Sequence, residues 1–314
     1  MRAVRFHGPG DLRVEEVPDP APGPGDVLVQ VEVALTDGTD LKAFRRGHPV
    51  LLGEPPSPFG HEFCGIDVAT GRRVVAANSA PCGACRPCSR GRPTLCENLR
   101  PLLNGAYAEL LVVPERIARV NLHPVPAGLA PEVAAFLEPL ACALHAVDVA
   151  GADAGQAALV LGPGPMGMLL CACLRDAGAR VAVAGGSAER RALAARFGAV
   201  PGEAPAEVVV EATGTPEGWR AAVDAATAGG TVVFFSGLPT DATVELPAYG
   251  IHYEELTLRG SFHHTPQTVR AALGFLASGA YPWHELLTHE VGLEALPELF
   301  AEPPAGYLKA IVRP

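Results

Sequence analysis

The pattern of apolar and polar positions changes partway along the chain, and the two patterns predict different kinds of structure. In the first 120 or so residues, short apolar stretches alternate with polar positions and are separated by turns rich in glycine and proline. This pattern is typical of short β-strands, which we expect at residues 2–6, 12–17, 27–33, 64–69, 72–77 and 106–113. Closely spaced short strands predict a β-rich first domain of partly barrel-like form.

Beyond Pro131 the pattern indicates helices and apolar strands in alternation. We expect one long helix from Pro131 to Val149. Strands are then expected at 158–161, 180–184, 206–210 and 229–235, with helices at 166–177, 188–197 and 216–226 between them. Such alternation predicts an α/β fold with a parallel sheet covered on both faces. A helix at 265–278 and a strand at 307–312 close the chain, and we expect the strand to return to the first domain.

Composition narrows the class of protein. The 314 residues suit two domains that each bury a core, and 48% hydrophobic with 18% charged residues is typical of a soluble globular protein. A net charge of −10 without a basic block disfavours a nucleic acid or an anionic membrane as partner. The N-terminus has no apolar signal segment, so we expect a cytoplasmic protein. In a reducing compartment its eight cysteines are metal ligands or core thiols rather than disulfides.

A glycine-rich turn lies where the first apolar strand of the second half meets its helix. It reads Gly162-Pro163-Gly164-Pro165-Met166-Gly167, a G-x-G-x-x-G motif in the order strand, turn, helix that dinucleotide binding requires. Gly162 would permit the tight turn, Gly164 would let backbone amides approach a pyrophosphate, and Gly167 would let helix and strand pack closely. We therefore assign the turn, with Pro163 and Met166, to a dinucleotide cofactor; an ordinary turn is the alternative.

Four cysteines fall within fifteen residues of a loop rich in glycine and proline. Cys82, Cys85, Cys88 and Cys96 have the spacing C-x2-C-x2-C-x7-C, which can wrap one tetrahedral zinc ion. A closed four-cysteine site leaves no open coordination position, so this zinc would be structural. Iron–sulfur ligation is the rival, but the bacterial ferredoxin run has three residues before its last cysteine and proline after it. Here seven residues precede Cys96, and Glu97 follows.

Several motifs together resemble the zinc-dependent medium-chain dehydrogenase/reductase family. They are Gly60-His61-Glu62, the four-cysteine lobe, the GPGPMG turn and the EATG at Glu211 to Gly214. The triplet Glu138-Pro139-Leu140 resembles the sorbitol/polyol and glucose dehydrogenase branch of that family. The resemblance implies a GroES-like catalytic domain over 1–139 and 264–314 and a Rossmann domain over 140–263. It also implies alcohol–ketone interconversion at a zinc ion and a homodimer or homotetramer.

The resemblance implies a catalytic zinc with an unusual ligand set. Family members usually carry cysteine before the G-T-D motif, but this chain has Asp37 there. A carboxylate can still ligate zinc, and some glucose dehydrogenases of the family have aspartate at this position. His61 would be the imidazole ligand, Glu138 matches the acidic third ligand of the polyol branch, and Glu62 would bind directly or through water. The alternative is that Asp37 marks a lost metal site and that His61 merely packs.

Two further residues of the motif match catalytic roles of the family. Thr39 matches the relay hydroxyl that passes the alcohol proton toward the cofactor ribose or solvent, and a capping role in a turn is its alternative. Asp40 matches the carboxylate that orients the ligand histidine and fixes its tautomer. Tyr107 and Glu109 either reach substrate hydroxyls or belong to a strand that faces solvent.

Cofactor choice depends on the end of the second strand of the nucleotide domain. Relatives that prefer NAD place Asp or Glu there to bind the ribose 2′-hydroxyl, whereas this chain has Gly185. Without that carboxylate a 2′-phosphate is not repelled, and Ser187, Arg190 and Arg191 would contact it, so we favour NADP over NAD. The alternative is that the arginines form a solvated helix face and that NAD binds loosely. Lys309 is assigned to the cofactor as well. The segment 199–207 is shorter than in relatives, so we expect one strand–helix unit of the nucleotide domain to be trimmed.

The sequence therefore predicts a zinc-dependent, NAD(P)-dependent dehydrogenase acting on a polyol, a sugar or a related secondary alcohol. A zinc-free quinone or enoyl reductase on the same scaffold, with only the four-cysteine ion bound, is one alternative. A non-catalytic NADP(H)-binding regulator is another. Metal content separates the first two, because they would hold two zinc ions and one zinc ion per chain respectively.

Overall fold

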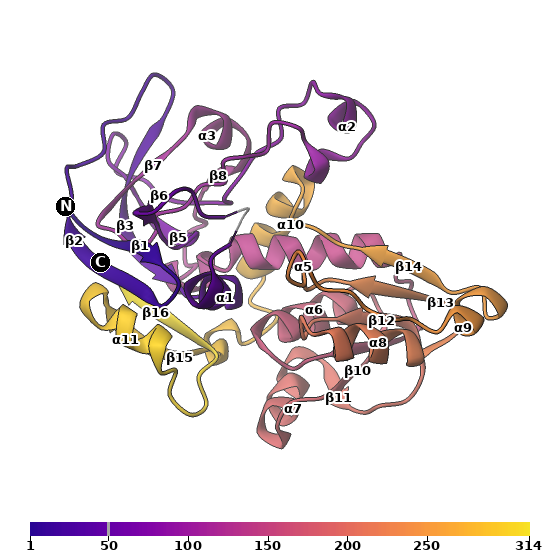
Figure 1. Cartoon of the computed structure of the whole chain (residues 1–314). Helices are drawn as coiled ribbons and strands as arrows, with labels where there is room; N and C mark the ends of the chain where they lie inside the picture. The colour runs from indigo at the N-terminus through magenta and orange to yellow at the C-terminus, as the bar shows by residue number, and fades with distance from the viewer. Residues whose placement is uncertain (49–50) are drawn as a thin grey trace. The chain divides into compact units, whose positions relative to one another are not determined.

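A computed structural model of the chain describes residues 1–48 and 51–314 (Figure 1). The chain divides into two compact units. Unit 1 comprises Met1–Glu138 and Thr265–Pro314, and unit 2 comprises Pro139–His264. Each boundary lies one residue from the one expected from the sequence. Among the described residues, no helix is long and apolar enough to cross a membrane.

Unit 1 is built on two sheets whose strands come from distant parts of the chain. The smaller sheet has the order β2-β1-β4, with β1 at Arg2–Gly8, β2 at Asp11–Glu16 and β4 at Ser57–Pro58. The larger has the order β15-β16-β3-β5-β6-β8, and β7 also pairs with β3. Its strands are β3 (Val27–Leu35), β5 (Glu62–Asp67), β6 (Arg73–Ala76), β7 (Leu110–Val113), β8 (Leu122–Pro124), β15 (Leu287–Gly292) and β16 (Lys309–Arg313). The closing strand β16 does return to this unit, where it runs antiparallel to β3.

The prediction of one strand over 106–113 was only half right. Strand β7 begins at Leu110, and Ala108 makes a single bridge to Ala3. Before that, the backbone N–H of Ala106 donates to the carbonyl of Gly60, and that of Tyr107 donates to the carbonyl of Phe59. The N–H of Val4 in β1 also donates to the carbonyl of Tyr107, and the N–H of Glu109 donates to that of Arg2, so this segment is bridged to β1 without forming a regular strand.

Helices and turns connect the strands of unit 1. They are α1 (Gly38–Arg46), α2 (Arg86–Ser89), η1 (Pro93–Leu95), α3 (Glu115–Asn121), α4 (Pro131–Ala134), α10 (Pro266–Ala277), η3 (Trp283–Leu286), η4 (Leu293–Ala295) and α11 (Leu296–Ala301). The single helix expected over 131–149 is wrong, because α4 ends at Ala134 and α5 spans Leu137–Ala150. Between them the N–H of Phe136 bonds the carbonyl three residues earlier, and its ring is fully buried. The alternating pattern also failed to reveal α1.

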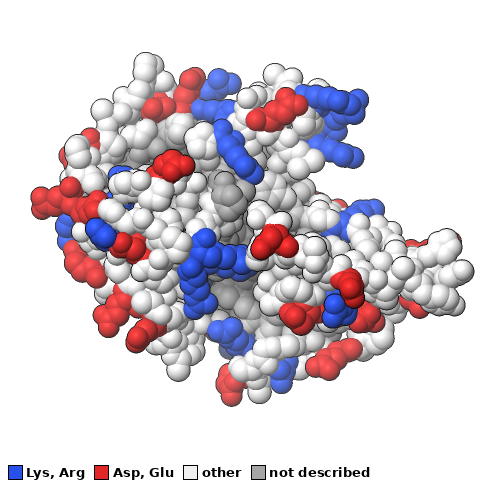
Figure 2. Space-filling model, viewed as in Figure 1, with Lys and Arg blue, Asp and Glu red and all other residues white. Residues whose placement is uncertain are grey.

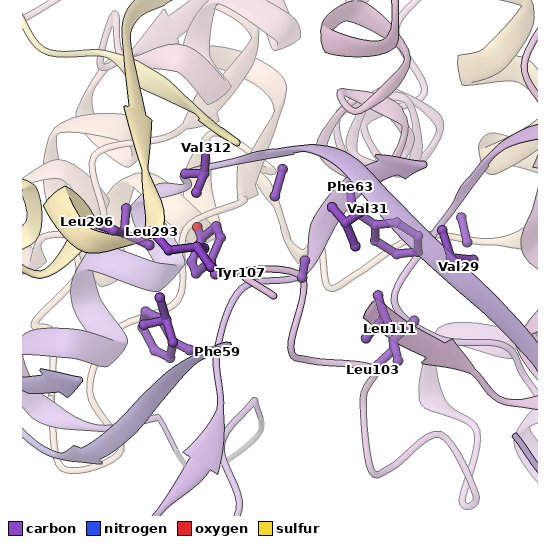
Figure 3. Close-up of a cluster of buried hydrophobic side chains, with 14 of the residues drawn as sticks. Val29, Val31, Phe59, Phe63, Leu103, Tyr107, Leu111, Leu293, Leu296 and Val312 are labelled. Atoms are coloured by element: carbon purple, nitrogen blue, oxygen red, sulfur yellow. The ribbon is translucent and has the colours of Figure 1, made fainter. Parts of the chain in front are cut away.

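Aromatic rings and branched aliphatic side chains make the core of unit 1 (Figure 3). The ring of Phe59 lies 5.9 Å, centroid to centroid, from that of Tyr107 and 5.9 Å from that of Phe300. Val29 and Val31 of β3 and Val312 of β16 contribute to the same cluster. Burial of these side chains supplies the hydrophobic free energy that holds the C-terminal segment against the N-terminal strands.

Unit 2 contains one parallel sheet with the order β11-β10-β9-β12-β13-β14. The strands are β9 (Ala157–Leu161), β10 (Arg180–Ala184), β11 (Ala199–Pro201), β12 (Ala206–Glu211), β13 (Ala226–Phe234) and β14 (Thr257–Gly260). The connecting helices are α6 (Pro165–Asp176), α7 (Ala188–Ala194) with the turn η2 (Ala195–Phe197), α8 (Pro216–Asp224) and α9 (Ala248–Tyr253). The expected alternation of strands and helices is confirmed. No helix separates β11 from β12, in keeping with the short segment noted in the sequence.

The strand order of unit 2 places a binding edge. Counting along the chain, the order reverses between β9 and β12, which lie side by side in the middle of the sheet. In open parallel sheets, ligands bind outside the carboxyl ends of the strands at such a reversal. Leu161 and Glu211, the last residues of β9 and β12, are paired in register there. The glycine turn follows directly after Leu161.

Candidate active site and metal centres

The four cysteines of the lobe converge in unit 1. Their Sγ atoms all lie within 4.8 Å of one another. Cys85 caps α2, Cys88 lies inside it, and Cys96 follows η1, so two short turns bring the sulfurs together. A zinc ion bound at about 2.3 Å from each sulfur needs sulfurs this close, so the donor set fits a closed structural zinc site.

Backbone and side-chain N–H groups point at the sulfurs of this lobe. The N–H of Cys82 donates to Cys96 Sγ at 3.2 Å, and that of Cys85 donates to Cys82 Sγ at 3.4 Å. Hydrogen bonds from Ala84, Asn98 and Cys85 lower the pKa of Cys82 to about 6. These donors favour the thiolate, the form that binds metal, at Cys82, whereas burial and the neighbouring cysteines raise the pKa of Cys88 to about 12.

A second group of possible ligands forms where β3 ends and β5 begins. Leu35, the last residue of β3, is paired with Glu62, the first residue of β5. Asp37 follows just after β3 and His61 just before β5, so the register of the two strands brings them together. The ligand atoms of Asp37, His61 and Glu62 all lie within 4.8 Å of one another. Two carboxylates and an imidazole are donors that zinc accepts, so the residues fit the expected ion.

Asp37 begins helix α1 and is held by Thr39. Its carboxylate accepts from the backbone N–H of Thr39 and from that residue's side chain. Burial raises the pKa of Asp37, but the charges of Lys309 and His61 together with the Thr39 hydrogen bonds outweigh burial and lower it to about 2. Asp37 is therefore anionic, as a ligand must be. These hydrogen bonds agree with the capping alternative for Thr39, and its relay role stays a prediction.

The imidazole of His61 is oriented by a buried chain of hydrogen bonds. Its Nδ1 lies 3.0 Å from Oδ1 of Asp40, and the hydroxyl of Tyr107 donates to the other oxygen of Asp40. Burial lowers the pKa of His61, but the charge and hydrogen bond of Asp40 prevail and raise it to about 10. Since Nδ1 faces Asp40, Nε2 is the nitrogen left for a metal ion.

Tyr107 is a buried part of the site rather than a surface residue. Its side chain is fully buried, whereas Glu109 is bound to Arg2 at the surface. Gly60 lies against the Tyr107 ring with φ +90, and a Cβ at Gly60 would come within 2.7 Å of ring atoms. Only glycine therefore fits at this position of the Gly-His-Glu motif, because the ring of Tyr107, whose hydroxyl bonds Asp40, leaves no space for a side chain.

Lys309, assigned to the cofactor from the sequence, forms an ion pair inside unit 1, and its cofactor role stays a prediction. Its Nζ lies 2.9 and 2.8 Å from the two carboxylate oxygens of Glu62, and both side chains are almost completely buried. The ammonium group also lies 5.6 Å above the ring of Phe136. A strand from the end of the chain thus brings a compensating cation to the candidate metal site.

Glu138, expected as a third ligand, lies at the start of α5 and is almost fully buried. Among the described residues, the close group of Asp37, His61 and Glu62 does not include it. Its negative charge is nevertheless one of the influences that raise the pKa of His61. Glu138 is therefore within electrostatic reach of the imidazole.

In unit 2, the glycine turn has the close approaches that its motif predicts. Gly162 has φ +103, a conformation that residues with a side chain rarely adopt. A Cβ on Gly167 would lie 1.9 Å from the carbonyl oxygen of Gly162, whereas an added Cβ on Gly164 would meet nothing within 4 Å. Pro163 and Met166 lie in the same turn, and α6 begins directly after Gly164. The open space beside Gly164 and the free N–H groups of the helix fit a pyrophosphate.

The loop that follows β12 lies beside this turn and is held by hydrogen bonds to Glu211. Oε1 of the buried Glu211 accepts from the N–H of Thr213 at 2.5 Å and from that of Gly214 at 2.8 Å. A Cβ on Gly162 would come within 3.1 Å of the Ala212 carbonyl. Glu211 thus acts as an internal cap for the loop. The sequence provided only the motif, not this role.

The candidate residues for the 2′-position also gather in one turn of unit 2. Gly185 follows β10, and the hydroxyl of Ser187 caps α7 by accepting from the N–H of Arg190 at 3.3 Å. Arg191 Nη1 donates to the carbonyls of Gly185 and Gly186. In the structure, therefore, this nitrogen of Arg191 bonds backbone oxygens.

Comparison with known proteins agrees with both units. The profile of the alcohol dehydrogenase GroES-like domain matches residues 23–127, and that of the zinc-binding dehydrogenases matches residues 200–278. The chain is 30% identical to L-threonine 3-dehydrogenase of Xanthomonas oryzae pv. oryzae (strain MAFF 311018), covering 95% of each. It is 28% identical to L-galactonate-5-dehydrogenase of Escherichia coli (strain K12), covering 96% of this chain and 94% of that protein.

Among solved structures, the chain resembles a protein of Sinorhizobium meliloti 1021, provisionally classed as a zinc-binding dehydrogenase, that is bound to NADP. The two are 34% identical with a TM-score of 0.89, covering 100% of this chain and 99% of the other. The fold, the motifs and the relatives define one class, and the chain belongs to the zinc-dependent medium-chain dehydrogenase/reductase family. It is an NAD(P)-dependent oxidoreductase of the alcohol dehydrogenase type, with a GroES-like unit and a Rossmann unit.

Proposed function

We propose that this chain oxidises a polyol, a sugar or a related secondary alcohol, that it holds one structural and one catalytic zinc ion, and that it prefers NADP. The observation that carries the proposal is the convergence of Asp37, His61 and Glu62, with His61 oriented by Asp40. Similarity to enzymes named for L-threonine and L-galactonate supports a small hydroxylated substrate. The NADP-bound relative supports the cofactor preference.

The catalytic ion would be held by Asp37 and His61, with Glu62 or Glu138 as a further oxygen ligand. A zinc ion there supplies Lewis acidity toward the substrate oxygen. Asp40 accepts a hydrogen bond from Nδ1–H of His61, so the lone pair that zinc would bind after displacing a proton is the one on Nε2. Oxygen ligands in place of a thiolate make the site more anionic and should bind zinc less tightly than the family's usual set.

Thr39 and Tyr107 have separate tasks in this proposal. The half-buried hydroxyl of Thr39, which bonds Asp37 in the structure, would turn from that carboxylate, receive the proton that the substrate hydroxyl releases and pass its own toward solvent or the cofactor ribose. The hydroxyl of Tyr107 stays inside the unit and fixes Asp40. Hydride transfer then needs a nicotinamide cofactor seated on the glycine turn of Gly162, Gly164 and Gly167.

A second candidate is a zinc-free reductase on the same scaffold. It is favoured by the ion pair of Lys309 with Glu62, which neutralises one carboxylate of the site without any metal. In that case the lobe of four cysteines would hold the single zinc ion of the chain. Asp37 in place of the usual cysteine agrees with either candidate.

Metal content and substrate profile test the proposal together. Purified protein should contain two zinc ions per chain and should oxidise some member of a panel of sugars, inositols and simple alcohols faster with NADP than with NAD. His61→Ala should lose one zinc and abolish turnover while keeping NADP affinity, and the exposed His284→Ala is the matched control. A single zinc in active wild-type protein, or normal turnover of His61→Ala, would assign the zinc-free reductase instead.

We also propose a cytoplasmic homodimer or homotetramer. All eight cysteines are free thiols in the structure, which suits a reducing compartment. The oligomer follows from family resemblance. Light scattering on the purified protein measures it, and a monomer at micromolar concentration would contradict it.

A further inference from the structure

The turn after β10 in unit 2 is held by an arginine from the helix that follows it. Gly185 and Gly186 both have positive φ, +80 and +59, a backbone conformation that residues with a side chain rarely adopt. Arg191 lies one turn into α7, and its Nη1 donates to the carbonyl of Gly185 at 3.0 Å and to that of Gly186 at 2.7 Å. Both N–H groups of one guanidinium nitrogen are thereby used on the turn.

This turn is fitted against the glycine turn expected to bind the pyrophosphate. A Cβ at Gly186 would come within 2.6 Å of Pro163 Cγ, so only glycine fits there. The N–H of Gly162 donates to the carbonyl of Ala184 at 2.9 Å. A displacement of the Gly185–Gly186 turn would therefore disturb the neighbouring turn, and the two hydrogen bonds of Arg191 limit such displacement.

The chemistry of the two cofactors differs at the ribose 2′-position that this turn would face. The 2′-hydroxyl of NAD is bound most tightly when the protein offers an acceptor, and the usual carboxylate is missing at Gly185. The carbonyl oxygens of Gly185 and Gly186 are acceptors in the same turn, but each already accepts a hydrogen bond from Arg191. A 2′-phosphate needs donors instead, and a guanidinium has three further N–H groups beyond those on Nη1.

We propose that Arg191 is a positioning residue that makes this turn selective for a cofactor with a 2′-phosphate, because it withdraws both carbonyl acceptors from the 2′-hydroxyl of NAD. This inference rests on the proposed preference for NADP. It differs from a simple phosphate contact in its effect on NAD. A residue that only contacts the phosphate strengthens the binding of NADP and leaves the binding of NAD unchanged. Arg191 strengthens the binding of NADP and also weakens the binding of NAD.

Equilibrium binding separates these two roles without relying on turnover. Dissociation constants for NADPH and NADH are measured by calorimetry for the wild type, Arg191→Ala, Arg191→Lys and Arg190→Ala. Arg191→Ala should weaken NADPH binding by about tenfold or more, which is the scale of one charge-assisted hydrogen bond. The same variant should tighten NADH binding by about two- to tenfold, because the carbonyls are released. Arg191→Lys keeps the charge but not the two-carbonyl contact, so it should recover part of the NADPH affinity.

Arg190→Ala is the comparison for a residue expected only to contact the phosphate, because the bonds of Arg191 to the two carbonyls stay in place in that variant. It should weaken NADPH binding and change NADH affinity little. If Arg191→Ala leaves NADH affinity unchanged or weakens it, the positioning role is wrong even if NADP remains preferred. If the wild type binds NADH as tightly as NADPH, the preference for NADP itself fails, and the inference fails with it. Circular dichroism confirms that each variant is folded before its affinities are compared.

Discussion

Glu62 and Lys309 form a buried ion pair although 247 positions separate them in the chain. Glu62 opens β5, and Lys309 opens β16, so the pair ties the closing strand to the candidate metal site. Burial of a lone charge is costly, and each of these charges is tolerable mainly because the other is present. The charge balance of the site therefore depends on a segment that the local motifs do not contain.

Removing one partner of this pair should destabilise the protein strongly. Lys309→Met leaves the carboxylate of Glu62 without its cation and should lower the free energy of unfolding by about 3–5 kcal/mol in urea titrations. The double variant Lys309→Met with Glu62→Gln should regain much of that loss, because no uncompensated charge remains. Arg2→Ala, which breaks an exposed pair with Glu109, serves as the control and should change stability little. Equal stability of the single and double variants would contradict this account.

Asp40 should control metal affinity through His61 rather than by binding the ion. Asp40→Asn weakens the hold on Nδ1 of His61 and allows the other tautomer, so zinc affinity at this site should fall by about ten- to a hundredfold. Tyr107→Phe keeps the carboxylate and removes only the hydroxyl bonded to it, so its effect should be smaller. Competition with a chromophoric chelator measures the zinc affinity of both variants. The zinc of the four-cysteine lobe should be unaffected, and its loss in Asp40→Asn would indicate general unfolding instead.

The sequence predicted those parts of the site that depend on short spacings. Four cysteines within fifteen residues and three glycines within six carry their geometry locally, and the structure brings each set together. The role of Tyr107 was not predictable, because its contact with Asp40 depends on a segment that leaves the strand pattern and turns into the core. The Lys309–Glu62 pair was equally hidden, since the register of β16 against β3 decides which charges meet. Helix α1 was not predicted from the sequence, although Asp37 is a typical N-cap residue. The motif around Asp37 was assigned to the catalytic site and not to the start of a helix.

The four-cysteine lobe should lose its ion when one sulfur is removed. Cys88→Ser should release one zinc per chain and make residues 82–96 more susceptible to proteolysis. NADPH affinity should remain close to that of the wild type, because the glycine turn lies in the other unit. Ser89→Ala, an exposed neighbour in the same short helix, is the control. Elemental analysis counts the zinc, and an unchanged count in Cys88→Ser would remove the structural assignment.

The last prediction concerns Gly185, where the structure has room for a side chain. A Cβ there would meet only the nitrogen of Gly162, at 3.9 Å, and aspartate tolerates a positive φ better than most residues. Gly185→Asp should place a carboxylate where the ribose 2′-oxygen is expected, accepting from the hydroxyl of NAD and repelling the phosphate of NADP. A hydrogen bond to a charged group contributes about 1.5–3 kcal/mol, so the ratio of kcat/KM for NAD over NADP should rise by roughly ten- to a hundredfold.

Gly186→Asp is the matched control for that change, because the same side chain one residue later has no space. Its Cβ would lie 2.6 Å from Pro163 Cγ, so the variant must move the turn and should lose affinity for both cofactors together. The two variants carry the same added charge, and a general electrostatic effect would therefore make them alike. If Gly185→Asp also weakens both cofactors equally, the ribose lies elsewhere than beside this turn. Glu189, the next acidic residue along α7, is then the first partner to test.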